Sequence, residues 1–108
     1  MSKPSAILAE TPQPPYYSVT TTAVLSNNTQ GYFEMAAVLL DAAQHAPGFL
    51  GLEVCLQEDS GIAVSYWRSR QDITAWSRQQ QHLAAKEMAN KKWFSHYVTR
   101  IAKVEREY

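Results

Sequence analysis

The chain has 108 residues, with ten basic and ten acidic side chains, and 45% of its residues are hydrophobic. This length fits one domain with one core. The balanced charge gives no net field to recruit nucleic acid or an anionic membrane. The N-terminus lacks a signal-like apolar run, and no apolar stretch approaches the roughly 20 residues that span a bilayer. We therefore expect a cytoplasmic protein with no nucleic-acid or membrane partner.

The N-terminal segment differs from the rest in composition. Residues 1–15 hold four of the five prolines, which predicts an extended or flexible arm ahead of a domain at 16–108. Cys55 is the single cysteine, so no intrachain disulfide can form. It lies inside an expected strand, with no histidine or cation near it in sequence. We expect a buried, unreactive thiol.

The first half of the domain reads as a strand and a helix. β-branched and aromatic residues at 16–25 predict the strand, and turn residues follow at 26–31. A helix is expected from about Tyr32 to His45, ended by Pro47. Its apolar stripe is Tyr32, Ala36, Leu39, Leu40 and Ala43.

A β-hairpin is expected next. Residues 49–57 alternate, and a turn at 58–61 leads to a third strand at 62–69. The first of these strands should carry its apolar residues on one face: Leu50, Leu52, Val54 and Leu56. In the next strand, one face should hold Ile62, Val64 and Tyr66, and the other Ala63, Ser65 and Trp67.

The following segment predicts one helix that ends and a second helix that begins soon after it. Ser69 and Asp72 form a variant capping box for a helix that turns Trp76 inward. Ser77 and Gln80 form a second such pattern, so a break is expected there, with His82 in the first turn of the new helix. Asn90 is a plausible left-handed cap at the end of this helix. Residues 97–108 are expected to form the last strand.

The order strand, helix, strand, strand, helix, strand predicts an α+β, ferredoxin-like βαββαβ fold. Its antiparallel sheet should carry both helices on one face. Trp67 and Cys55 are expected opposite the leucine row, so both faces of the sheet would carry apolar side chains. We infer that a second copy covers the helix-free face in a twofold homodimer.

Residues 46–54, "APGFLGLEV", and the segment from Gly61 to Glu107 resemble the antibiotic biosynthesis monooxygenase (ABM) domain family. The resemblance is carried by the Pro-Gly-Phe turn, Tyr66-Trp67, the helix start at 72–76, His82, Trp93-Phe94 and the terminal "VEREY". It covers about residues 17–108. It implies a dimeric α+β barrel, with a pocket between the sheet and the helices of each subunit. Members of the family include cofactor-free oxygenases of phenols, anthrones and quinols, and haem-degrading enzymes.

The first functional hypothesis is cofactor-free monooxygenation of a small aromatic molecule. No metal motif or glycine-rich nucleotide loop is visible, so the substrate itself would supply electrons to oxygen after losing a proton. His82 is the candidate catalytic base, because imidazole titrates near neutral pH. Two tryptophans would clasp a flat ring, and three further side chains would hydrogen-bond its oxygens if they point inward. These substrate-binding candidates are Trp67, Trp76, Tyr66, Tyr97 and Arg100.

Two other functions stay open. A non-catalytic dimer that binds a hydrophobic small molecule fits the same residues, since the tryptophans are also compatible with a plain core. Haem degradation ranks lower, because the resemblance places the haem-ligand histidine ten residues after Trp76, where this chain has Lys86. A metal site is not expected, since His45, His82 and His96 lack ligand spacing.

Overall fold

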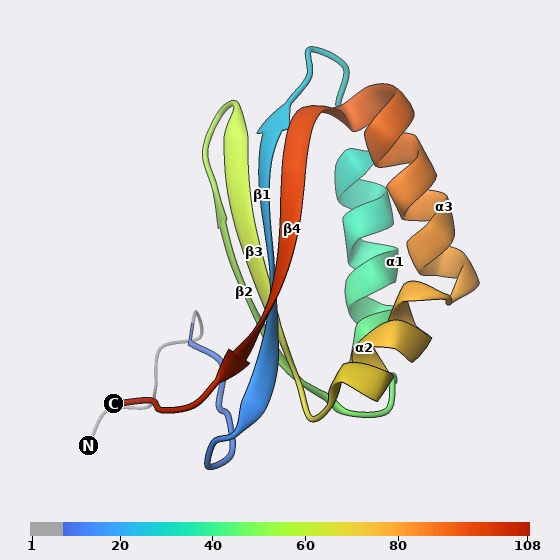
Figure 1. Ribbon diagram of the computed structural model, residues 1–108. Helices are drawn as coiled ribbons and strands as arrows, with labels where there is room; N and C mark the ends of the chain where they lie inside the picture. The colour runs from blue at the N-terminus through green and yellow to red at the C-terminus, as the bar shows by residue number, and fades with distance from the viewer. Residues whose placement is uncertain (1–7) are drawn as a thin grey trace.

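Residues 8–108 are described by a computed structural model, so the first seven residues of the expected arm lie outside the described part of the chain. Residues 8–15 form no helix or strand. The elements follow the predicted order (Figure 1). They are β1 Tyr16–Leu25, α1 Tyr32–Gln44, β2 Phe49–Leu56, β3 Ser60–Trp67, α2 Arg70–Ser77, α3 Gln80–Met88, the π-helical turn η1 Ala89–Trp93 and β4 Phe94–Val104.

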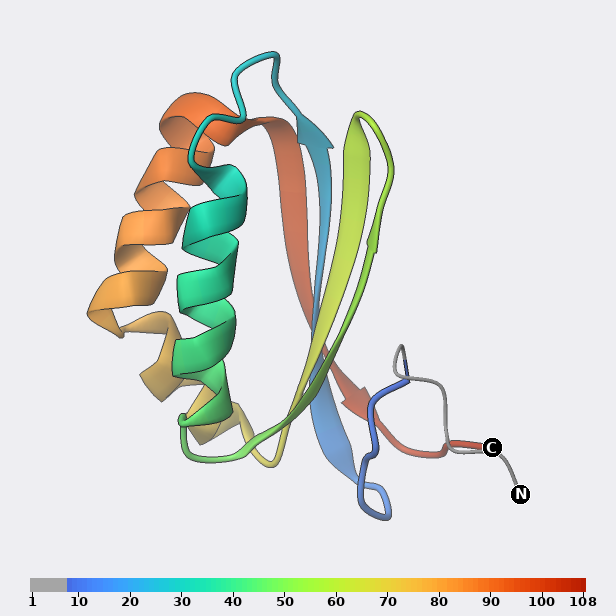
Figure 2. The same ribbon diagram turned by 180° about the vertical axis from the view of Figure 1, so that it is seen from behind.

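The strands form one antiparallel sheet in the order β2-β3-β1-β4. All helices lie over one face of this sheet, and the other face carries none, as Figure 1 and the reverse view in Figure 2 show. The predicted α+β, ferredoxin-like fold is therefore confirmed. Within residues 8–108, no helix is both long and apolar enough to cross a membrane.

The register of the sheet decides which residues meet the helices, because directly paired residues share a face. Even-numbered residues of β2 pair with odd-numbered residues of β3, as Leu52 does with Ser65. Trp67 pairs with Phe49, and the register shifts between Phe49 and Gly51. The leucine row and Trp67 therefore share the helix-covered face. The expectation that they lie on opposite faces is wrong, because alternation within a strand does not fix its pairing with the next strand.

The core lies where α2 packs on the sheet. Trp67 is 0% exposed and clusters with Ala46 and Ile73. Phe49 meets the Trp67 ring edge-on, with centroids 5.4 Å apart. These apolar contacts fix the position of α2, from which the chain continues to His82.

A turn and a cap fix the start of α2. Gly48 has φ of +80°, and a Cβ atom there would lie 2.0 Å from a carboxylate oxygen of Asp72. Only glycine accepts both this conformation and this approach. The Ser69 cap is confirmed: its Oγ accepts the Asp72 backbone N–H at 3.1 Å and donates to Asp72 Oδ2 at 2.9 Å.

The chain breaks between α2 and α3 as predicted, and His82 lies in the first turn of α3. Ser77 is not the cap of α3, because its hydroxyl donates to the Thr74 carbonyl at 2.7 Å and Gln79 takes the cap position. Asn90 is not a left-handed cap either. It lies within η1, which delivers the chain to β4 three residues earlier than expected.

The helix-free face is the side of the sheet that holds Thr22, Ile62 and Val98 in register across β3, β1 and β4. Cys55 pairs with Ile62 and is exposed in the single chain. The expectation of a buried thiol is wrong for this chain, because Cys55 lies on the edge strand β2 and faces away from the helices.

Candidate functional site

A cavity of about 440 Å³ lies between the helix-covered face of the sheet and the helices. Its lining residues are Val19, Thr21, Tyr32, Met35, Ala36, Leu39, Leu52, Ala63, Ser65, Ile73, Trp76, Ser77, His82, Ala85, Lys86, Ala89, Trp93, Phe94, Tyr97, Thr99 and Ile101. Most of these are apolar or aromatic, with a few polar groups among them. This volume and lining are typical of a small-molecule site.

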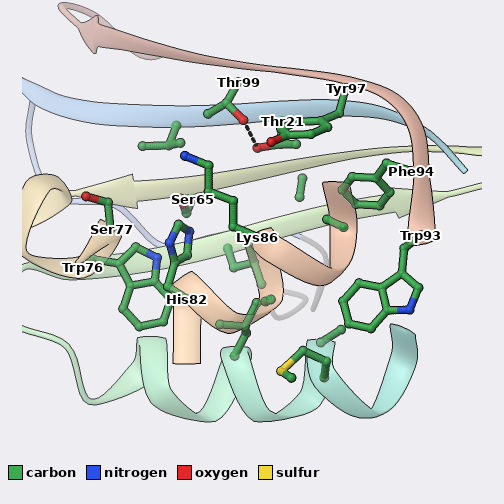
Figure 3. A pocket seen from close by; sticks show the side chains of 18 of the residues that line it. Thr21, Ser65, Trp76, Ser77, His82, Lys86, Trp93, Phe94, Tyr97 and Thr99 are labelled. Carbon is green, nitrogen blue, oxygen red and sulfur yellow. Dashed lines mark hydrogen bonds between the residues drawn. The ribbon is translucent and has the colours of Figure 1, made fainter. Parts of the chain in front are cut away.

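The cavity has two chemically different ends (Figure 3). Ser77, His82 and Lys86 gather beside Trp76, and we call this group the polar end. Tyr32, Trp93 and Phe94 form the aromatic end, where the Tyr32 ring lies 5.6 Å from Trp93 and 5.8 Å from Phe94. Burial raises the pKa of Tyr32, so its hydroxyl stays protonated at neutral pH.

His82 projects from the first turn of α3 against Trp76, with ring centroids 5.3 Å apart. Its Nδ1 atom is buried and has no hydrogen-bond partner among the described residues. Burial lowers the pKa of His82 below 6.5, the Ser77 backbone opposes that shift, and the Lys86 ammonium lowers the pKa further. The imidazole is therefore neutral at neutral pH, and neutral imidazole can accept a proton.

The tryptophan pair does not form the expected clasp. Trp76 lines the cavity, but Trp67 does not. The two rings pack on each other with centroids 5.8 Å apart at 31°, and the Trp67 indole N–H donates to Ser65 Oγ at 2.9 Å. Trp67 is 0% exposed within the core, so it offers no surface to a molecule in this cavity. Trp67 instead supports Trp76 from behind.

The three expected hydrogen-bonding side chains divide between the two faces. Tyr97 lines the cavity. Tyr66 and Arg100 pair with Ser18 and Thr20, which places both on the helix-free face. The condition that they point inward is not met for these two residues, because strand alternation turns them away from the helices. Tyr66 instead donates to Glu53 Oε1 at 2.6 Å, and burial together with Glu53 raises the pKa of Tyr66.

Several cavity residues were not predicted. Thr21 and Thr99 share a hydrogen bond of 2.9 Å between their Oγ1 atoms on the cavity wall (Figure 3). Trp93 is 4% exposed, and its indole N–H donates to the Gln30 carbonyl at 2.9 Å. Of these residues, only Lys86 could have been placed at the cavity from the sequence. It follows His82 by four residues, so the two side chains lie on the same side of a helix.

The histidines do not come together. His45 ends α1, where its Nδ1 atom lies 2.8 Å from the Asp41 carbonyl, and His96 is exposed on β4. In the part of the chain that the structure describes, no three His, Cys, Asp or Glu side chains are placed to hold a metal ion. The polar groups in the lining of the cavity include His82, Lys86 and several hydroxyl groups.

Comparison with known proteins gives a consistent result. Residues 15–88 match the family described as "Antibiotic biosynthesis monooxygenase". A Bacillus subtilis (strain 168) protein, "Uncharacterized protein YqjZ", is 44% identical over 101 residues, which cover 93% of this chain and 89% of that protein.

Solved structures that share the fold at low sequence identity include the following two. SnoaB from Streptomyces nogalater, a cofactor-independent oxygenase in its N63A form, aligns with TM-score 0.73 and 9% identity over 85% of this chain and 95% of its own. Rv0793 from Mycobacterium tuberculosis aligns with TM-score 0.75 and 7% identity over 85% and 97%. The sequence match over residues 15–88 settles the family: the chain belongs to the antibiotic biosynthesis monooxygenases, as its resemblance predicted.

Proposed function

We propose that this chain is a cofactor-independent monooxygenase that acts on a small, electron-rich aromatic substrate such as a phenol, quinol or anthrone. The observation that carries the proposal is an imidazole whose buried Nδ1 atom has no hydrogen-bond partner among the described residues, in the lining of an aromatic-rich cavity of about 440 Å³. Family membership supports the reaction class, and SnoaB provides an example of a cofactor-independent oxygenase with this fold.

Proton removal is the step that His82 would perform. A phenol or enol gives electrons to oxygen far more readily as its anion, and a neutral imidazole in the cavity can take the proton. For an anthrone, the ring CH₂ becomes C=O, one oxygen atom enters the product, and the other leaves with both hydrogens as water. The substrate supplies all the electrons, so the step balances without an external reductant.

The other lining residues would bind the ring and keep water out. Trp76 and the aromatic end offer flat apolar surfaces, against which an aromatic ring packs favourably. Tyr97, Thr21 and Thr99 bring hydroxyl groups to the cavity wall, where they could bind substrate oxygens. The apolar lining would also limit the contact of the reactive anion with water.

Oxygen uptake with a panel of quinols and anthrones tests the proposal. We expect at least one substrate to consume one oxygen molecule per turnover, and His82→Gln to slow it by about 100-fold or more. His45→Gln serves as the matched control, because His45 lies at the end of α1, outside the cavity lining. An H82Q variant that matches the parent rate on an active substrate would contradict the assignment of the base.

The same panel of compounds distinguishes the oxygenase from the alternative, a non-catalytic binding protein. If no compound of the panel is turned over, but one of them raises the melting temperature, the cavity binds molecules without oxygenating them. That result would replace the oxygenase by a binding protein that uses the same cavity.

We also propose that two copies pack through their helix-free faces. Val24, Ile62 and Val98 are 46%, 47% and 41% exposed on that face, and a second copy would cover them together with Cys55. Twofold packing of this kind is the commonest way to bury such a surface. It would make each copy's sheet one wall of a shared barrel, while each cavity remains within its own subunit.

Sedimentation at micromolar concentration tests the dimer. The parent chain should sediment as a dimer, and Ile62→Asp should convert it to a folded monomer, because a charge would be buried in the interface. Val38→Asp is the matched control: Val38 is 49% exposed on α1, on the helix side of the sheet. A parent chain that sediments as a monomer would overturn the proposal.

A further inference from the structure

The polar end of the cavity holds a positive charge with no opposite charge beside it. Lys86 is the only Lys, Arg, Asp or Glu side chain among the described residues that line the cavity. The neighbouring Glu87 cannot offset it, since Glu87 accepts from Lys91 Nζ at 2.7 Å on the exposed side of the helix. That pair is the one ion pair found within residues 8–108.

Lys86 lies beside the proposed base. It follows His82 by one turn of α3, so both side chains project from the same side of the helix. Figure 3 shows its side chain reaching from α3 toward the sheet next to the imidazole. The amine and the imidazole therefore lie at the same end of the cavity, and the aromatic end lies across the cavity from them.

We propose that Lys86 is a specificity-determining residue, which selects aromatic molecules that carry a negative charge or an ionising oxygen at one end. Such a molecule would place its anionic end between Lys86 and His82 and its uncharged rings at the aromatic end. Lys86 is exposed at the edge of the cavity, so an anion placed against the apolar lining would be attracted by its ammonium through partly screened electrostatics. Apolar rings gain by leaving water at the opposite end. Oxygenation of the selected molecule rests on the proposed function, but its selection by charge does not.

Two fluorescent probes with the same ring system test the selection. Both 1-anilinonaphthalene-8-sulfonate and N-phenyl-1-naphthylamine have a naphthalene bonded to an anilino nitrogen, and only the first carries an anion. We expect Lys86→Met to weaken binding of the sulfonate about tenfold and to leave the uncharged probe within about twofold. Lys86→Arg should keep the affinity for the sulfonate. Lys103→Met is the control, since it removes the same charge at an exposed position outside the cavity lining and leaves the Lys91–Glu87 pair intact.

The location of the probe is part of the test. The imidazole proton signals of His82 should shift when the sulfonate binds, because the two groups would be neighbours. The proposal fails if K86M leaves the ratio of the two affinities unchanged, if K103M changes it as much, or if the His82 signals do not move.

Oxygen uptake distinguishes this proposal from the proposed function. If K86M loses the preference for the anion while no compound is oxygenated, charge selection stands and the oxygenase fails. If quinols or anthrones are oxygenated while K86M keeps the parent's affinity ratio, the oxygenase stands and the role of Lys86 fails.

Discussion

The helix-covered face and the helix-free face of the sheet differ in how their polar side chains find partners. On the helix-free face, Tyr66 donates to Glu53 and Tyr16 donates to Glu107, while the two tyrosine rings meet edge-on with centroids 5.8 Å apart. On the other side, the Nδ1 atom of His82 is buried with no partner among residues 8–108.

This difference separates structural from functional polar groups. A buried polar atom without a hydrogen bond costs free energy, so folding alone gives no reason to keep it there. The tyrosines of the helix-free face are satisfied within the chain and need no ligand. Under the proposed function, a bound molecule would satisfy the imidazole by giving it a proton.

The largest expected effect on stability belongs to Trp67, which fills the core behind the cavity. Trp67→Ala should lower the free energy of unfolding by about 3–5 kcal/mol, because it removes a fully buried indole from the contacts with Phe49 and Trp76. Urea denaturation measures this loss. A loss below about 1 kcal/mol would mean that the helices are held over the sheet by other contacts.

Tyr66, the adjacent residue on the opposite face, should have a smaller effect. Tyr66→Phe removes one hydrogen bond and should cost about 1 kcal/mol in the same denaturation experiment. Glu53 keeps a partner in the Ala9 backbone N–H, at 3.0 Å, so its carboxylate is not left alone. A Y66F variant with parental stability but reduced oxygen uptake would break the division of roles between the faces.

The pH dependence of stability should carry a small contribution from His82. Its folded-state pKa is lowered below the model-peptide value of 6.5, so the unfolded chain binds more protons as the pH falls through that range. Its contribution to stability is therefore full above pH 6.5 and declines below it. His82→Gln should remove this part of the acid-side slope in urea denaturation.

An NMR titration of the His82 imidazole measures this pKa directly. The pKa should lie below 6.5 in the parent and rise in Lys86→Met, because burial remains while the repulsion by the ammonium is lost. A parental pKa at or above 6.5 would show that the imidazole is not held neutral by its surroundings.

Local sequence patterns predicted the elements well because their signals are local. The helix from Tyr32, the Ser69 cap and the break before His82 all depend on residues within one or two turns of each other. The faces of the sheet were harder to predict. Alternation shows that Tyr66 and Trp67 point in opposite directions, but pairing and helix placement decide which of them meets the helices.

The candidate site shows the same limit. His82 and Trp76 could be placed near a pocket because both lie in the segment around the helix break. Trp93 could not, since it reaches the cavity only through η1 and its contact with Tyr32, which is far away in sequence. Whether Trp67 binds a ligand or supports the core depends on packing distances, which composition and spacing do not contain.

Proton removal in the absence of oxygen tests the central claim most directly. An anthrone mixed with the protein under strictly anaerobic conditions cannot be oxygenated, but its enolate absorbs at longer wavelength than the neutral molecule. The parent protein should generate this absorption at neutral pH, and H82Q should not, although it still binds the compound. Equal enolate formation in H82Q, or oxygen uptake by a parent that never forms the anion, would contradict the account.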